Sequence, residues 1–297
     1  MKRIPSALVD VFAPAPGAGN RVAVVLDARG MSPEEMQAVA QSLGAAEAAF
    51  LLERTGAALS VRFFAPGGEV EFSGHAAVAV GLTAARTGLV PEGTTRLYLH
   101  TPTEVLPVEL VLEAGEPRKA WVRGPAPRFR DLPPYRALRE VLEALGSDER
   151  YLHRGLPYGV AFTGLWSLFV PLIAPGVVDA LEPEMERLKA LCFRLDVATV
   201  HAYAPMGPRS FYARDFAPLL GIPEDPVTGS ANAALGALLA RAGVVPRREG
   251  KVLLTVYQGH HLGNPGVVEV QVEYSPTGEP YSVQIGGEAV IVQTGEV

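Results

Sequence analysis

Hydrophobic positions in the first part of the chain follow two spacings, one typical of strands and one of helices. Residues 32–43 predict a helix, because Ser32 suits the N-cap, Pro33 the first helical position and Glu35 the end of a capping box. Strands are predicted for the short apolar runs at 7–12, 21–26, 50–53 and 61–65. This mixture of elements predicts an α+β fold.

Two later segments are apolar on every face of a helix. They are 75–87 and 230–242, both rich in Ala and Leu and almost uncharged until the last turn. A helix that is apolar all round is buried, so each is expected to run through the centre of its own domain. Further strands are predicted after the two helices, at 95–100, 105–112, 251–257 and 267–274.

The two apolar helices belong to an internal repeat. Residues 74–88 and 229–243 are identical at seven of 15 positions, and both segments continue into Val-Pro. Ahead of the helices, Arg-Phe-Phe-Ala-Pro at 62–66 is similar to Arg-Asp-Phe-Ala-Pro at 214–218. Chance similarity between two Ala-rich helices is the alternative, but the matches beyond the helices favour duplication.

The boundary between the halves is expected within 116–134, which is rich in Pro and Arg and poor in periodicity. We therefore predict two similar domains, 1–116 and 117–297, with the last strand as a candidate to pack on the first domain. Two similar domains that face each other leave a cleft between them, where small ligands commonly bind.

Composition excludes several classes of partner. The net charge of −6, the pI of about 5.6 and the lack of a basic block argue against nucleic acid. The uncharged run 155–178 is long enough to span a bilayer, but Pro157, Pro171 and Pro175 favour short buried strands instead, so no membrane is expected. The single cysteine, Cys192, excludes internal disulfides and suits the cytoplasm.

Each buried helix begins at a glycine that follows a hydroxyl residue, at Ser73-Gly74 and at Thr228-Gly229-Ser230. A helix N-terminus offers unpaired N–H groups and positive partial charge, and glycine lets a ligand approach the backbone closely. Two such starts at one cleft would hold a small carboxylate from both sides. Simple capping of the helices by Ser73 and Thr228 is the alternative.

Three side chains near these starts are candidates for proton transfer. Glu47 lies in an apolar run, where partial burial suits a general base, although exposure is the alternative. The dipole of the first helix disfavours a charged His75, and a packed, hydrogen-bonded histidine is the alternative. Asp225 can cap the second helix, form a turn, or accept a proton or ammonium group.

Adjacent His260 and His261 point apart on a strand and have no further ligand at suitable spacing, so no metal is expected.

The motifs along the whole chain resemble the PhzF-like isomerases of phenazine biosynthesis. In the first half they are Val9-Asp10-Val11-Phe12, Gly19-Asn20, Glu47-Ala48-Ala49-Phe50, Phe64-Ala65-Pro66 and Gly74-His75-Ala76. In the second half they are Val170-Pro171-Leu172, Phe216-Ala217-Pro218, Gly221-Ile222, Gln258-Gly259 and the highly specific Glu224-Asp225-Pro226-Val227-Thr228-Gly229-Ser230-Ala231.

The resemblance implies a diaminopimelate-epimerase-like fold, in which two similar domains each wrap a curved, mostly antiparallel sheet around a central helix. It also implies a homodimer without a cofactor. The family's acid/base glutamate falls on Glu47, and its histidine and aspartate fall on His75 and Asp225. The substrate-binding set comprises Asn20, Ser73, Gly74, Thr228, Gly229 and Ser230. The best-understood member isomerises a dihydro-hydroxyanthranilate by moving a proton along the ring.

Departures from the family pattern favour a substrate other than the phenazine precursor. Ser73 and Thr228 stand where related epimerases place cysteines, which excludes two-thiol racemisation. Arg21 replaces a proline, Asn232 replaces a histidine, and 43–46 lack the usual Asn and Ser. We predict a cofactor-independent isomerase that moves a proton on a small carboxylate by glutamate-based acid/base catalysis. A non-catalytic carboxylate-binding protein and a racemase with two oxygen bases are the alternatives.

Overall fold

The computed structural model describes residues 3–297 and divides them into two compact units. The first unit comprises 3–123 together with 286–297, and the second comprises 124–285. The predicted boundary at 116/117 differs from this division because residues 116–123 form a strand of the first unit. Pro117, Ala120 and Val122 point inward along that strand, but the neighbouring Arg and Lys residues hide the alternation in the sequence.

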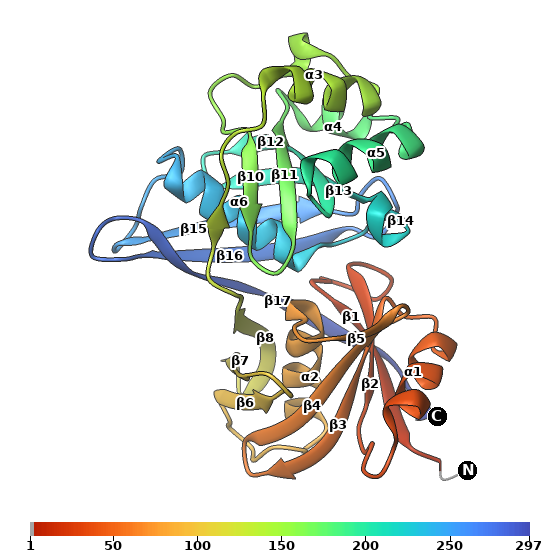
Figure 1. Cartoon of the computed structure of the whole chain (residues 1–297). Helices are drawn as coiled ribbons and strands as arrows, with labels where there is room; N and C mark the ends of the chain where they lie inside the picture. The colour runs from red at the N-terminus through yellow and green to blue at the C-terminus, as the bar shows by residue number, and fades with distance from the viewer. Residues whose placement is uncertain (1–2) are drawn as a thin grey trace. The chain divides into compact units, whose positions relative to one another are not determined.

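The first unit is a sheet with two helices (Figure 1). Its elements are β1 (Pro5–Val11), β2 (Asn20–Val25), α1 (Pro33–Ser42), β3 (Glu47–Thr55), β4 (Ala58–Ala65), β5 (Gly68–Val70), α2 (Gly74–Arg86), β6 (Arg96–His100), β7 (Val105–Glu113), β8 (Glu116–Arg123) and the later part of β17 (Pro280–Glu296). The pairings form a circuit, β17–β1–β2–β3–β4–β6–β7–β8–β17. Pairs β2–β3 and β4–β6 are parallel, whereas β1–β17, β1–β2, β3–β4, β6–β7 and β7–β8 are antiparallel.

Helix α2 packs against β1, β2, β3, β7 and β8, which explains why it is apolar on every side. From Gly74 to Ala84 every residue except His75 is buried. The close packing depends on Gly81, because a Cβ there would lie 2.8 Å from Val108 Cγ1 of β7. The site residue His75 is therefore carried on a helix that is fixed by the core of the unit.

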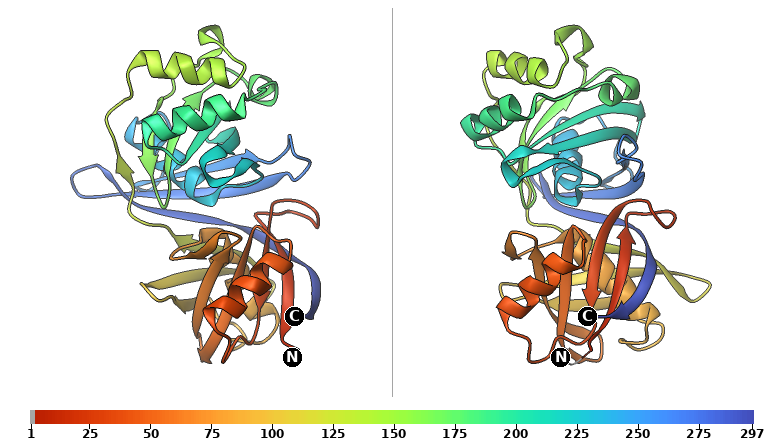
Figure 2. Two further views of the ribbon diagram at one scale, coloured as in Figure 1. Left: turned by 45° about the vertical axis from the view of Figure 1, so that its right-hand side comes forward. Right: turned by 90° about the vertical axis from the view of Figure 1, so that its right-hand side faces the viewer.

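Helix α1 lies against β3 and β4 (Figure 2) and confirms the predicted capping box. The Glu35 N–H donates to Ser32 Oγ at 3.2 Å, and the Ser32 N–H donates to Glu35 Oε2 at 2.8 Å. Met36 and Ala40 face the core of the unit, where they pack with Phe50 of β3 and neighbouring apolar residues. This packing holds the first residues of β3, where Glu47 lies.

The second unit also combines strands and helices (Figure 1). Its elements are β9 (Arg128–Phe129), α3 (Tyr135–Ala144), β10 (Gly159–Phe162), β11 (Trp166–Pro171), α4 (Pro175–Asp179), α5 (Met185–Leu195), β12 (Thr199–Gly207), β13 (Ser210–Ala217), β14 (Ile222–Asp225), α6 (Gly229–Arg241), β15 (Lys251–Gln258), β16 (Gly266–Tyr274) and the start of β17, with 3-10 turns at Glu149–Tyr151 and Pro218–Leu220. Pairs β11–β12 and β13–β15 are parallel, whereas β10–β11, β12–β13, β13–β14 and β15–β16 are antiparallel.

Helix α6 packs against β10, β11, β15 and β16, and Gly236 allows the close approach, since a Cβ there would lie 2.5 Å from Val270 Cγ1 of β16. Helices α3 and α5 contact each other (Figure 2) and share a core with alternate residues of β12 and β13, such as Val200 and Phe216. Because successive residues of a strand point to opposite faces, His201 and Asp215 lie on the other face of these strands.

Most predicted elements are confirmed, with boundaries shifted by a few residues. The helices predicted at 75–87 and 230–242 begin one residue earlier, at Gly74 and Gly229. The uncharged run 155–178 forms β10, β11 and most of α4. Within residues 3–297, no helix is long and apolar enough to cross a membrane.

Candidate functional site

Two predicted proton-transfer residues of the first unit lie close together. Glu47 opens β3, beside Val22 of β2, and His75 lies in the first turn of α2. Glu47 Oε2 is 3.7 Å from His75 Nε2, and the side chains are 19% and 14% exposed. Both atoms are buried without a hydrogen-bond partner among residues 3–297. A separation of 3.7 Å is too long for a direct hydrogen bond, so both groups can still bind a ligand.

Ser73 connects the start of α2 to the imidazole. The Ala76 N–H donates to Ser73 Oγ at 3.2 Å, so Ser73 is the side-chain N-cap of the helix. Ser73 Oγ also lies 3.3 Å from His75 Nδ1. Because Ser73 Oγ already accepts the Ala76 N–H, its own hydroxyl can donate to Nδ1. A neutral His75 then carries its proton on Nε2, the atom that faces Glu47.

Asn20 and Arg21 begin β2 at a loop that is held by a buried carboxylate. Asp10 of β1 is only 1% exposed and accepts hydrogen bonds from the Gly17 N–H at 2.7 Å and from Arg21 Nε and Nη2 at 2.8 and 3.1 Å. The hydrogen bond to Asp10 raises the pKa of Arg21. Arg21 thus holds the loop in place through its hydrogen bonds to Asp10. The signal in the sequence is a lone carboxylate, Asp10, inside the apolar strand of β1.

The second unit places Asp225 and Thr228 in direct contact at the start of α6. Thr228 Oγ1 donates to Asp225 Oδ2 at 2.6 Å, and Thr228 makes no side-chain capping hydrogen bond to α6. Thr228 therefore does not repeat the capping role of Ser73, although both residues precede a helix glycine. The N-terminal end of α6 keeps backbone donors that a ligand can use.

Gln258 joins the elements around Asp225 with four hydrogen bonds. Its Oε1 accepts the Thr228 N–H at 3.1 Å and Asn232 Nδ2 at 2.7 Å, while its Nε2 donates to the Asp225 carbonyl at 2.9 Å and to Thr228 Oγ1 at 3.1 Å. Gln258 is fully buried at the end of β15. Sequence reasoning identified it only as part of a motif, because its partners lie far away in the chain.

Gly229 and Ser230 form the first turn of α6. Thr163 Oγ1 donates to the Ser230 carbonyl at 2.6 Å, so this turn is also tied to the loop between β10 and β11. Gly229 is buried, whereas Ser230 is partly exposed. The two units are thus alike in presenting polar side chains at the start of a buried helix.

The prediction that His260 and His261 point apart on a strand is wrong, because both lie in the turn that follows β15. Both are exposed, and the ring of His260 packs near Tyr212 and Tyr257. Within residues 3–297, no three or more His, Cys, Asp or Glu side chains are grouped as metal ligands.

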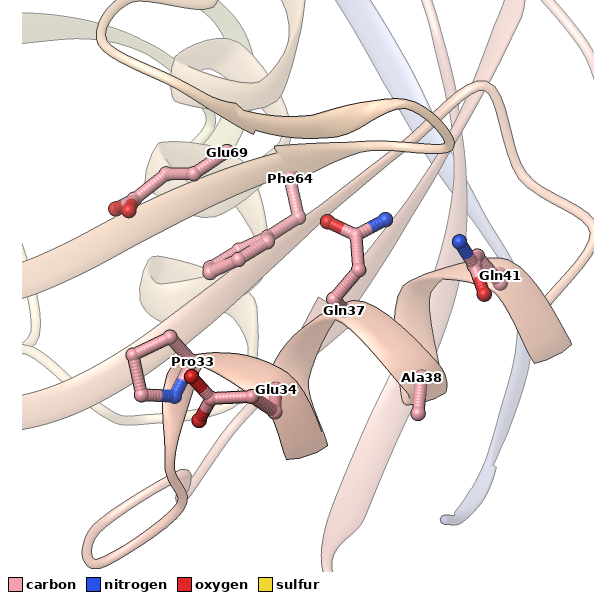
Figure 3. A pocket seen from close by; sticks show the side chains of 7 residues that line it. All are labelled: Pro33, Glu34, Gln37, Ala38, Gln41, Phe64 and Glu69. Carbon is pink, nitrogen blue, oxygen red and sulfur yellow. The ribbon is translucent and has the colours of Figure 1, made fainter.

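A hollow on the first unit includes none of the predicted site residues in its lining (Figure 3). It is lined by Pro33, Glu34, Gln37, Ala38, Gln41, Phe64 and Glu69. Gln37 and Gln41 point from α1 toward the β4–β5 turn, where both donate to the Pro66 carbonyl. Glu69 is held by Arg62 through two hydrogen bonds. These polar groups bind one another, so we assign no chemistry to the hollow.

Comparisons with known proteins place this chain among one group of sequences over its whole length. The family model described as phenazine biosynthesis-like protein (PhzC-PhzF) matches residues 9–295. An uncharacterized isomerase of Deinococcus radiodurans is 46% identical, with 97% of this chain and 93% of that protein covered. The trans-2,3-dihydro-3-hydroxyanthranilate isomerase of Pseudomonas fluorescens is 30% identical, with 98% of each covered. The crystal structure of a PhzF-family phenazine biosynthesis protein of Bacillus anthracis is 30% identical, has a TM-score of 0.89, and matches 100% of this chain and 99% of that one.

Proposed function

The chain belongs to the phenazine biosynthesis-like (PhzF) family and is an isomerase, and from this premise we propose that it moves a proton on a small carboxylate substrate with Glu47 as the acid/base. The observation that carries the proposal is the pair formed by Glu47 Oε2 and His75 Nε2, which face each other at 3.7 Å without other partners among the described residues. Unpartnered, partly buried polar atoms of opposite hydrogen-bonding character suit a site that a substrate completes.

The proposed reaction is a proton transfer in two steps. The Glu47 carboxylate first takes a proton from a substrate carbon, and the electron pair of that C–H bond moves into an enolate-like system. The Glu47 carboxyl then returns a proton to a different carbon, so that the product is an isomer and the enzyme is unchanged. His75 Nε2–H donates a hydrogen bond to the oxygen on which negative charge develops.

The substrate carboxylate is proposed to bind at the helix starts. At α2 the N–H of Ala76 is already used by Ser73, so the N–H groups of Gly74 and His75 are the proposed donors. The backbone donors at 229–231 of α6 lack a side-chain cap. That both starts serve one substrate is a prediction from the sequence repeat, and the Asp225→Asn variant tests the contribution of the second unit.

Solvent proton exchange is the experiment that tests the proposal. The protein is incubated in deuterated water with amino acids and cyclic unsaturated acids, and the C–H signals are followed by NMR, with the Glu47→Gln variant in parallel. Exchange by the wild type alone supports Glu47 as the acid/base. Ligand-induced stabilisation without exchange supports carboxylate binding without catalysis, and exchange with stereochemical inversion supports a two-base racemase.

Two further parts of the proposal are independent of the substrate. We propose that the protein is cytoplasmic and forms a homodimer, and sedimentation equilibrium tests the dimer. We also propose catalysis without a cofactor, which predicts that exchange persists after dialysis against a chelator. The Arg21 and Asn232 departures also lead us to propose a substrate other than that of the Pseudomonas fluorescens relative.

A further inference from the structure

Three titratable residues of the second unit lie in one row across neighbouring strands. His201 of β12 is directly opposite Asp215 of β13, and Asp215 is directly opposite Asp225 of β14. Both strand pairs are antiparallel, so facing residues point to the same side and their Cβ atoms are about 5 Å apart. The row runs from a fully buried histidine to the partly exposed site residue Asp225.

At the buried end of the row, only half of the polar side-chain atoms have a hydrogen-bond partner. His201 Nδ1 and Asp215 Oδ1 are 2.9 Å apart, and both side chains are 0% exposed. The remaining polar atoms, His201 Nε2 and Asp215 Oδ2, are buried and have no hydrogen-bond partner among the described residues. Buried polar atoms without partners are costly, so such a pair in the middle of a sheet calls for a reason beyond packing.

The first unit shows that the fold does not need this pair. There the corresponding row consists of Ala49, Phe63 and Val70, with Ala49 opposite Phe63 and Phe63 opposite Val70. Phe63 and Asp215 hold the same place in the repeated motifs at 62–66 and 214–218. The titratable pair therefore occurs in the row that leads to a predicted site residue and not in the row that ends in valine.

We propose that His201 and Asp215 are positioning residues that increase the proton affinity of Asp225. The inference rests on the proposed function, in which Asp225 handles the substrate. The hydrogen bond between His201 Nδ1 and Asp215 Oδ1 fixes the Asp215 carboxyl group in the row, directly opposite Asp225. A negative charge on Asp215 opposes a second negative charge on Asp225. Asp225 then carries a proton through which it donates a hydrogen bond to the substrate and that it keeps throughout the reaction, while its Oδ2 accepts the hydrogen bond from Thr228 Oγ1.

The elements beside the row carry a few other titratable groups. Arg214 and Glu224 alternate with Asp215 and Asp225, so they point to the opposite face, where two hydrogen bonds at 2.9 and 2.7 Å join them. Tyr203 on β12 donates its hydroxyl to the Pro157 carbonyl. Helix α6 carries no titratable residue before Arg241. On α5, burial raises the pKa of the Cys192 thiol to about 12, and the negative charge of Asp215 adds to this rise.

Carboxyl titration by NMR tests the inference without a substrate. The protein is labelled with ¹³C at the aspartate carboxyl carbon, and the Asp225 signal is assigned by its loss in the Asp225→Asn variant. In Asp215→Asn, the titration midpoint of Asp225 is expected to fall by about one pH unit. An unchanged midpoint in a folded variant overturns the inference. Asp196→Asn, an exposed substitution at the end of α5, is the matched control and leaves the midpoint unchanged.

A second variant keeps the test decisive if the Asp215→Asn substitution is poorly tolerated. The double variant His201→Ala with Asp215→Phe introduces the apolar pair of the first unit, and apolar replacement of a buried polar pair is often neutral for stability. If the pair is purely structural, the titration midpoint of Asp225 is unchanged in this variant, whereas the inference predicts the same fall as in Asp215→Asn.

If the midpoint of Asp225 falls in these variants but Asp225→Asn retains proton exchange, the inference stands and the role of Asp225 in the proposed function is wrong. If Asp225→Asn abolishes exchange and the midpoint does not move, the inference is wrong and the proposed function stands.

Discussion

Glu47 Oε2 and His75 Nε2 face each other at 3.7 Å, and neither atom has a hydrogen-bond partner among residues 3–297. A buried polar atom that is left unsatisfied costs about 1–3 kcal/mol. A bound substrate that forms hydrogen bonds with both atoms would remove this cost. This relationship underlies the predictions for the first unit.

Glu47→Gln is expected to slow proton exchange by about 10²- to 10⁴-fold, the usual contribution of a general acid/base, while ligand affinity changes little. The amide retains the shape of the side chain but cannot accept the proton. Rates are measured by NMR in deuterated water. Glu53→Gln is the control, because Glu53 lies on the same strand but is exposed. Wild-type exchange by the Glu47→Gln variant would remove this residue from the mechanism.

Ser73→Ala is expected to reduce both stability and exchange. The variant loses the N-cap of α2, which costs about 1 kcal/mol, and His75 loses the partner of its Nδ1. Urea unfolding measures the first effect and solvent exchange the second. Ser73→Thr keeps the hydroxyl and is expected to retain most of both. Equal exchange by the alanine and threonine variants would contradict the role of the hydroxyl.

Gly259→Ala is expected to destabilise the protein by about 1–3 kcal/mol. Gly259 has a φ of +87°, and a Cβ there would lie 2.3 Å from the Asn264 carbonyl oxygen and 2.7 Å from that of Pro226. Gly263→Ala is the control, since Gly263 has a φ of +75° and open space around it. The difference between the two variants in urea unfolding isolates the clash from the backbone strain. Similar losses in both variants would show that the close approach is unimportant.

Cys192 is expected to be unreactive in the folded protein. Burial raises the pKa of its thiol from 9.0 to about 12, so very little thiolate is present near neutral pH. Alkylation by iodoacetamide, followed by mass spectrometry, should be slow in buffer and fast in denaturant. Above pH 9 the unfolded chain loses this proton first, so the thiol reduces stability progressively between pH 9 and about 12. Fast labelling of the folded protein at about pH 8, below the ordinary thiol pKa, would contradict the burial.

The predictions that hold are those that depend on neighbours in the chain. Ser32 and Glu35 form their capping box within four residues, and the apolar helices are recognisable from their own composition. Contacts between strands are different. Nothing local shows that Asp215 is opposite His201, because that contact is set by the alignment of β12 and β13.

The two helix starts also show the limit of reasoning by similarity. Ser73 and Thr228 occupy matching places before Gly74 and Gly229, but only Ser73 caps its helix among the described residues. The Thr228 hydroxyl instead donates to Asp225, a carboxylate three residues earlier. Strand β8 was missed for another reason, since its charged outward residues hide the buried alternation.

Strand β17 has a consequence for the order in which the protein forms. Residues 280–285 belong to the second unit and residues 286–297 to the first. On the ribosome, residues 124–285 emerge before the strand that pairs with β1 is available. Until then, the β1 edge that pairs with β17 stays unpaired in the nascent first unit. An unpaired strand edge is a site of misassembly. The unit encoded first is thus completed last, when residues 286–297 leave the exit tunnel.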